Sequence, residues 1–177
     1  MHPNPARATI LIVAAISVAV ADADEQPVQV RSYSEGPLAV EDFRGEPPEF
    51  SHLDAETDTE VRYDFGCQTR YDSRRAAAWL TQLQIDAVVI QDRSWCKRWR
   101  MDAGLLDHEQ GHFDIAQIAC LQARIHFARM ARGGERMLVT GRTPQAATAR
   151  LREEIEKQMA PFIEAARAGH AEYDRIT

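Results

Sequence analysis

Alternating hydrophobic and polar residues in the middle of the chain predict a sheet. From residue 57 onward apolar side chains take every second position, at Val61, Tyr63, Phe65 and Cys67. This period is typical of a strand with one buried face. Residues 83–91 form a β-branched run and predict a better-buried strand. Residues 73–82 are ambiguous, because Ala76, Ala77 and Ala78 favour a helix whereas the flanking strands can extend through them.

A helical period replaces the alternation in the second half of the chain. Asp102 is the predicted N-cap of a helix that has no proline from Leu105 to Met130 and stops at Gly133 and Gly134. A second helix begins at Thr143, with Pro144 in its first turn. Its apolar residues recur at spacings of three and four: Ala147, Leu151, Ile155, Met159, Phe162 and Ala166. Strands followed by helices predict an α+β fold, a small antiparallel sheet followed by two long packed helices.

Residues 1–21 have the pattern of a cleavable signal peptide. Arg7 precedes an apolar run over residues 8–20, and Ala19 and Ala21 supply the small residues of a cleavage site. The run is short for a membrane span, although a retained N-terminal anchor helix is the alternative. We therefore expect a secreted or periplasmic protein with no stable membrane insertion after cleavage. Residues 22–56 are predicted to form an extended lead-in with one short strand, and residues 57–177 the folded domain.

Length, composition and charge narrow the class of protein. With 177 residues, one domain is the default. A hydrophobic share of 45% and a charged share of 27% exclude a wholly disordered, collagen-like or multi-pass membrane protein. The net charge of −6 repels phosphate groups, so no nucleic-acid partner is expected. A local patch of Trp99 with Lys97, Arg98 and Arg100 is more typical of a solvated turn, and the sequence indicates no oligomeric state.

Export changes how the three cysteines are interpreted, because an oxidising compartment allows thiols to pair. Cys67 and Cys96 lie on either side of the predicted sheet region, and a bond between them would close a loop worth about 3 to 4 kcal/mol in the chain-entropy model. We expect Cys67 to pair with Cys96 and Cys120 to be a small core residue. The alternative is three unpaired core thiols.

The segment His108-Glu109-Gln110-Gly111-His112 carries the chemistry, as an HExxH pattern within the first predicted helix. Four residues are slightly more than one helical turn, so both imidazoles project from one face and can bind the same ion. Glu109 is rotated by about 100° and can approach a water molecule on that ion without being a ligand. Leu105, Ile115 and Ala119 lie on the same side of the helix as the histidines. We therefore expect this side to pack against the rest of the protein. Two core histidines with ordinary hydrogen-bond partners are the alternative.

Zinc is the expected cofactor, because imidazole suits it and catalytic zinc takes three protein ligands plus water. His126 lies 14 residues beyond His112, roughly 21 Å along one helix, which is too far to share the ion. The third ligand is therefore open among His52, His170 and a carboxylate such as Asp174.

Metal-assisted hydrolysis is the chemistry that this spacing supports. Zinc lowers the pKa of a bound water to about 7 and polarises a carbonyl. Glu109 would act as general base and pass the proton to the leaving group, and Tyr173 is a candidate donor to the oxyanion.

Three stretches resemble the bacterial DUF922 family, described as predicted secreted zinc-dependent proteases. They are residues 38–45 (LAVEDFRG), Ser94-Trp95, and above all residues 105–115 (LLDHEQGHFDI), so the resemblance covers most of the mature chain. It implies a zincin-like metallopeptidase domain over residues 57–177, with His108 and His112 as zinc ligands and Glu109 as the catalytic residue. It also implies a peptide or protein substrate.

The sequence departs from this family in two places. Val40 stands where similar sequences commonly carry a Trp. Residues 173–177 (YDRIT) resemble the start of a C-terminal motif that continues to a His-Gly pair in similar proteins. If that histidine is the usual third ligand, a residue beyond Thr177 is absent here, and His170 or Asp174 would replace it. A non-catalytic envelope protein with an incomplete or structural metal site is the alternative function, and a helical interaction module with an accidental motif is a third.

Overall fold

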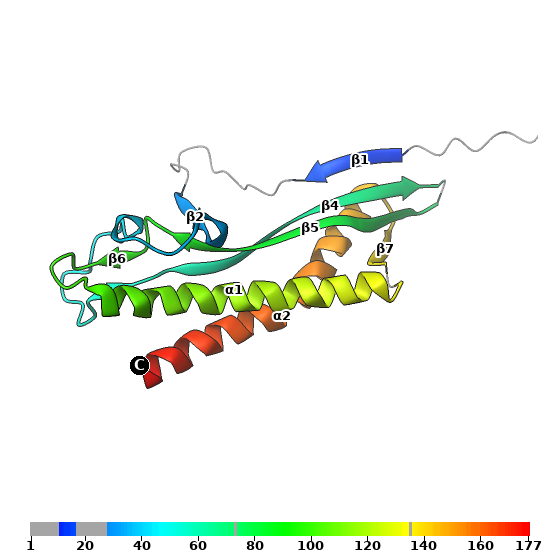
Figure 1. Ribbon diagram of the computed structural model, residues 1–177. Helices are drawn as coiled ribbons and strands as arrows, with labels where there is room; N and C mark the ends of the chain where they lie inside the picture. The colour runs from blue at the N-terminus through cyan, green and yellow to red at the C-terminus, as the bar shows by residue number, and fades with distance from the viewer. Residues whose placement is uncertain (1–10, 17–27, 73, 135) are drawn as a thin grey trace, which may run out of the picture. The chain divides into compact units, whose positions relative to one another are not determined.

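The computed structural model describes residues 11–16, 28–72, 74–134 and 136–177, which form an α+β fold with a small antiparallel sheet and two long helices (Figure 1). The described chain divides into two compact units. Unit 1 contains β1, Asp64–Gln84 and Arg129–Met159; unit 2 contains residues 28–63, Ile85–Ala128 and Ala160–Thr177. The expected fold class is thus confirmed at the level of α+β.

The sheet has the strand order β1-β4-β5-β2, with β7 also paired to β5. In chain order its strands are β1 (Leu11–Ile16), β2 (Val30–Ser32), β4 (Thr59–Tyr71), β5 (Ala76–Ile90) and β7 (Leu138–Gly141). A separate two-stranded sheet pairs β3 (Ala55–Glu56) with β6 (Trp95–Cys96). Residues 76–82, ambiguous in the sequence, are part of β5. They are extended because β5 pairs with β4, and its first residues pair also with β7, from Ala76 opposite Gly141 to Trp79 opposite Leu138.

Unit 1 buries the alternating face of its strands and one face of a helix. Phe65, Cys67 and Thr69 are buried on β4, as period two predicts. The first half of α2 (Pro144–Ile176) contributes the predicted apolar line of Ala147, Leu151, Ile155 and Met159, all fully buried. The helix begins as expected, since Thr143 Oγ1 accepts a hydrogen bond from the backbone N–H of Ala146.

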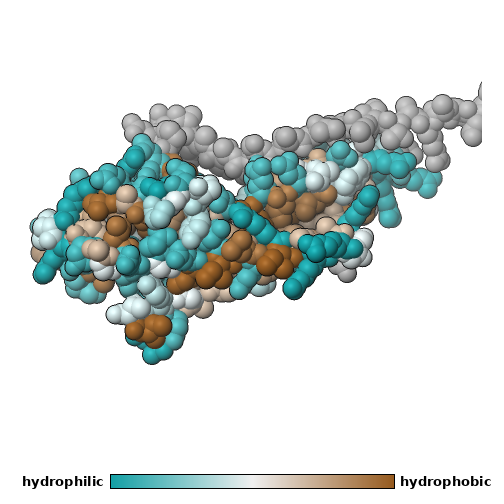
Figure 2. Space-filling view, viewed as in Figure 1, coloured by the Kyte–Doolittle hydropathy of each residue, from teal (hydrophilic) through white to brown (hydrophobic). Residues whose placement is uncertain are grey.

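The first long helix, α1 (Ala103–Arg132), has its buried face in unit 2. Asp102 caps it, since its side chain accepts the N–H of Leu105 at 2.8 Å. The helix stops at Gly133 and Gly134, where Gly134 has a φ of 76° that favours glycine. Phe113 is buried on this face, and the buried residues after it are small: Ala116, Ala119, Cys120 and Ala123. The larger side chains of Ile118, Leu121 and Ile125 are exposed, and Figure 2 shows a brown band along the middle of α1.

Residues 28–56 pack into unit 2. They contain β2, β3 and two short 3-10 helices, Tyr33–Glu35 and Val40–Asp42. Leu38, Phe43 and Ala55 are buried hydrophobic residues of this segment. The predicted signal peptide, residues 1–21, lies outside the described residues except for β1, which pairs with β4 from Leu11 opposite Arg70 to Ile16 opposite Phe65. Signal cleavage stays a prediction. In the described part of the chain, no helix combines the length and apolar character required to cross a bilayer.

The expected bond between Cys67 and Cys96 is wrong in this structure, where both thiols are free and buried. Each thiol is buried within its own unit. Cys67, on β4 in unit 1, is 2% exposed, and Cys96, on β6 in unit 2, is 6% exposed. Cys120 is a fully buried core residue, as expected.

The three free thiols yield a test of the folded state. Burial raises the pKa of Cys120 to about 11 and raises the pKa of Cys96, so both stay protonated at pH 8, and the thiolate is the reactive form. We expect the native protein to take up no iodoacetamide at pH 8 within minutes, and the denatured protein to take up three equivalents without reductant, by mass spectrometry. One equivalent after denaturation would instead indicate a disulfide.

Candidate metal centre

The HExxH residues lie in the second and third turns of α1, within unit 2. Their two imidazoles are neighbours, with ring centroids 5.0 Å apart and planes at 86°. The side chain of His112 is 11% exposed and that of His108 is 28% exposed. Both rings therefore lie on the packing side of the helix while one edge remains accessible to solvent.

Asp174, on the last turn of α2, faces both rings. Its Oδ1 lies 2.9 Å from Nε2 of His112 and 3.5 Å from Nε2 of His108. One donor atom from each of these three residues lies within 4.8 Å of the others. In Figure 1 the end of α2 runs beside the first half of α1, and the ring contacts between the two segments agree with this view. Of the third-ligand candidates, the structure brings Asp174 to the two Nε2 atoms.

The opposite nitrogen of each ring is held by another side chain. Nδ1 of His108 lies 3.1 Å from the hydroxyl of Thr177, and that hydroxyl donates to the carbonyl of Tyr173 at 2.8 Å. The single hydroxyl proton is thus used, so Nδ1 of His108 must be the donor to Thr177. Nε2 of His108 then carries the lone pair that faces Asp174, which is the form of the ring that can bind a cation.

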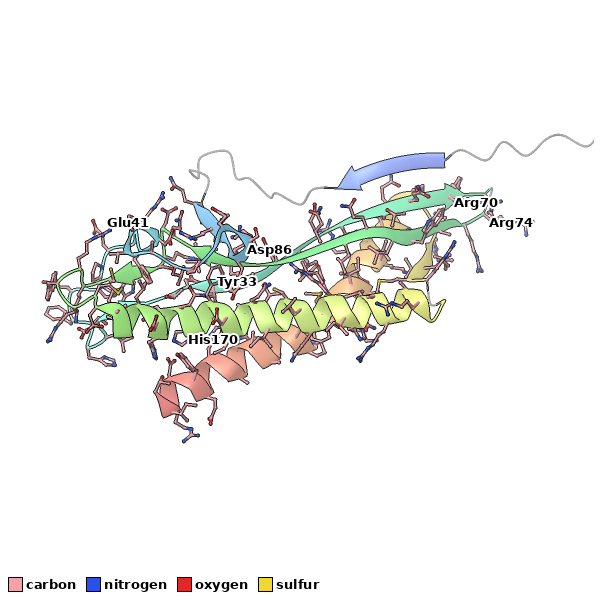
Figure 3. All side chains as sticks on the ribbon, in the orientation of Figure 1. Tyr33, Glu41, Arg70, Arg74, Asp86 and His170 are labelled. Carbon is pink, nitrogen blue, oxygen red and sulfur yellow. The ribbon has the colours of Figure 1, made fainter. Side chains whose placement is uncertain are left out.

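His170 holds the second ring in the same way. Its Nδ1 lies 3.1 Å from Nδ1 of His112, and its Nε2 lies 3.1 Å from the hydroxyl of Thr59. Burial lowers the pKa of His170, so its neutral form is favoured. When His170 donates to Thr59, it accepts the Nδ1 proton of His112, whose Nε2 is then free to bind a cation. His170 is therefore a partner of a candidate ligand. Figure 3 shows it between α1 and the end of α2.

Glu109 is buried beside this group, at 3% exposure. Its Oε2 accepts a hydrogen bond of 2.5 Å from the hydroxyl of Thr57. Burial is the largest effect and raises the pKa of Glu109, whereas the Thr57 hydrogen bond and the nearby imidazoles lower it. A carboxylate with a raised pKa next to two candidate ligands has the character of a general base.

Gln110 of the motif and two residues just after it connect α1 to the segment that follows β2. Gln110 Oε1 accepts the N–H of Leu38 at 2.8 Å, and its Nε2 donates to Asp114 at 2.6 Å. Asp114 also accepts the hydroxyl proton of Tyr33 at 2.9 Å, and the ring of Tyr33 packs edge-on against Phe113. Figure 3 shows Tyr33 and His170 on opposite sides of α1. The helix is thus held from both sides at the level of the histidines.

Tyr173 packs directly on the motif. Its ring stacks on His108 with centroids 5.0 Å apart, and it meets His112 edge-on at 5.3 Å. A Cβ at Gly111 would collide with the hydroxyl oxygen and Cζ of Tyr173, well inside van der Waals contact. Gly111 is therefore the position that lets α2 approach closely enough for Asp174 to reach the histidines.

Other residues singled out in the sequence lie elsewhere. His52 is on an exposed loop and His126 packs against Phe127 and Phe162, and neither belongs to the three-residue group. Sequence reasoning missed Thr57, Thr59 and Thr177, whose hydroxyls support Glu109, His170 and His108. Threonine is too common for spacing alone to have identified them.

We predict that Gly111→Ala destabilises the protein by about 1–3 kcal/mol, the usual cost of an overpacked contact, because the methyl group collides with Tyr173. Gly104→Ala is the matched control in the same helix, where the new methyl group meets only Asp102 Oδ1 at 3.4 Å. It should leave stability unchanged or raise it by up to about 1 kcal/mol. Urea unfolding of both variants measures the difference, and equal stabilities would contradict the close contact.

Comparison with known proteins identifies no relative: no family model, no curated protein and no solved structure matches this chain. The resemblance to the DUF922 family therefore stays a prediction that rests on the motif residues themselves.

Proposed function

We propose that this chain is an exported, zincin-type zinc metallopeptidase that hydrolyses peptide bonds. The observation that carries the proposal is the convergence of two imidazole Nε2 atoms and one carboxylate oxygen within 4.8 Å, beside a buried glutamate. Export rests on the signal-peptide pattern alone, and the peptide substrate rests on the family resemblance.

The donor set fits zinc. Two neutral imidazoles and one carboxylate are a common ligand set for catalytic zinc, which keeps a further position open. Asp174 is 59% exposed, so solvent and substrate have access from its side. The partners of the two Nδ1 atoms, His170 and Thr177, match the outer hydrogen bonds that orient metal-bound histidines.

Zinc bound here would polarise a carbonyl group and lower the pKa of a water molecule to about 7. The protein's own contribution is orientation and proton transfer. Thr57 holds one oxygen of Glu109 through a hydrogen bond, which leaves the other oxygen to accept a proton and deliver it to the leaving amine. The raised pKa of Glu109 brings it closer to neutrality, where proton transfer in both directions is efficient.

A second candidate function is a non-catalytic envelope protein with a structural metal site. The hydrogen bond of Glu109 to Thr57 favours it, because the same contact that orients a general base also satisfies a buried structural carboxylate. The two functions predict different effects of removing the Glu109 charge. A peptidase would lose turnover, whereas a structural site has no turnover to lose.

We expect the purified mature protein, prepared without chelator, to bind about one equivalent of zinc and to hydrolyse an unstructured protein such as casein. Glu109→Gln should keep the zinc and reduce the rate by about 100- to 10,000-fold, the range for a lost general base. Metal analysis and hydrolysis are measured on the same preparation. Zinc binding with no turnover in either form would favour the structural site, and no zinc binding would refute both functions.

Asp174→Asn should weaken zinc binding by at least about tenfold, because it removes the negative charge of a proposed ligand. Glu172→Gln is the matched control, since this fully exposed carboxylate, two residues away, pairs with Arg175 and not with the histidines. Competition with a chromophoric zinc chelator gives both affinities. If the two variants bind zinc equally well, Asp174 is not the third ligand.

A further inference from the structure

A pocket of about 310 Å³ opens in unit 2 beside the candidate metal centre. Its apolar walls are Val61 of β4, Ala116 of α1, and Ile163 and Ala166 of α2. Ala116 and Ala166 are buried, and their short side chains leave the space that larger residues would fill. The volume is at the lower end of the range for ligand pockets, about 300–1,000 Å³.

His170 joins this pocket to the metal centre. It lines the pocket and also contacts Nδ1 of His112, whose Nε2 faces Asp174. Thr59, the other hydrogen-bond partner of His170, is also a lining residue. One imidazole ring, that of His170, therefore separates the pocket from the proposed ligand His112.

The charged residues at the pocket are already paired. Glu60 forms ion pairs with Arg62, at 2.9 Å, and with Arg93. Arg167 pairs with Glu164 at 2.5 Å. Neither Glu60 nor Arg167 offers an uncompensated charge to a ligand. Of the two other polar lining residues, Thr59 bonds His170 Nε2, and Nδ1 of His170 contacts His112. The four remaining lining side chains are aliphatic. The pocket therefore favours an uncharged, apolar group.

We propose that this pocket binds an aliphatic side chain of the peptide substrate, of the size of leucine, isoleucine or methionine. The pocket would make the enzyme selective for aliphatic residues near the cleaved bond, with Ala116 and Ala166 setting its depth. This inference rests on the proposed peptidase function, which supplies the peptide, but binding to the pocket can be measured without turnover.

The binding test uses zinc-loaded Glu109→Gln protein and blocked peptides of the form acetyl-Ala-Gly-X-Ala-amide, followed by amide chemical shifts in NMR. With X as leucine, we expect saturable shifts at Ala116, Ala166 and His170. The affinity should be at least about tenfold higher than with X as aspartate or lysine, because an apolar pocket discriminates by this order against a mismatched side chain.

The pocket variant is Ala166→Leu, which fills the space and should abolish the preference for leucine. Ala168→Leu is its control, since Ala168 is exposed two residues away on the same helix and outside the pocket lining. If Ala166→Leu does not fold, Ile163→Ala removes an apolar wall and should weaken binding of the leucine peptide. Equal affinity for all four-residue peptides, or shifts confined to other residues, would overturn the proposal.

A cleavage test separates this inference from the proposed function. The wild-type enzyme digests an unstructured protein, and mass spectrometry locates the cut sites. Enrichment of aliphatic residues at one fixed position from the cut, lost in Ala166→Leu and kept in Ala168→Leu, supports the pocket. Cutting with no such enrichment overturns the pocket and keeps the peptidase. Absence of cutting overturns the peptidase, and the pocket is then decided by the NMR shifts alone.

Discussion

The close contact of Tyr173 with Gly111 is the constraint on which the candidate site depends. Without a side chain at position 111, the tyrosine ring lies against the helix backbone and stacks on His108. Asp174, the next residue, is then within 2.9 Å of His112. Every polar contact of the site between α1 and α2, including those of His170 and Thr177, needs this approach distance. A glycine that the HExxH pattern treats as arbitrary is thus a packing requirement in this chain.

The spacing of hydrophobic residues along the chain predicts much of the fold. Alternation over Val61 to Cys67 predicts β4, and the apolar line from Ala147 to Met159 predicts the buried face of α2. Local pattern did not decide residues 76–82, because their strand structure depends on pairing of β5 with β4 and, at Ala76–Trp79, with β7, more than 50 residues later. The cysteine pairing was wrong because spacing gives the size of a loop but does not show where each thiol is buried.

The candidate site was predictable to a similar extent. Helical geometry alone brings His108 and His112 to one face, because one turn takes 3.6 residues. The choice of Asp174 over His170 was not predictable, since both lie on one face of the second helix. The choice depends on the nitrogen of His112 that each residue contacts: Asp174 faces Nε2, and His170 contacts Nδ1. The proposed function still rests on the motif and on the donor atoms that converge at it.

The small residues on the buried face of α1 affect the position of the two histidines, although they lie further along the helix. Helices and sheets with alanine and cysteine at their contacts pack closer than those with leucine. Ala119, Cys120 and Ala123 therefore set how deeply α1 is seated, although they touch none of the proposed zinc ligands. A bulkier residue at any of these three positions would tilt or displace α1, and the imidazoles of His108 and His112 would move with it. The alignment of the donor atoms therefore depends on side chains two and three turns further along α1 that are not part of the metal centre.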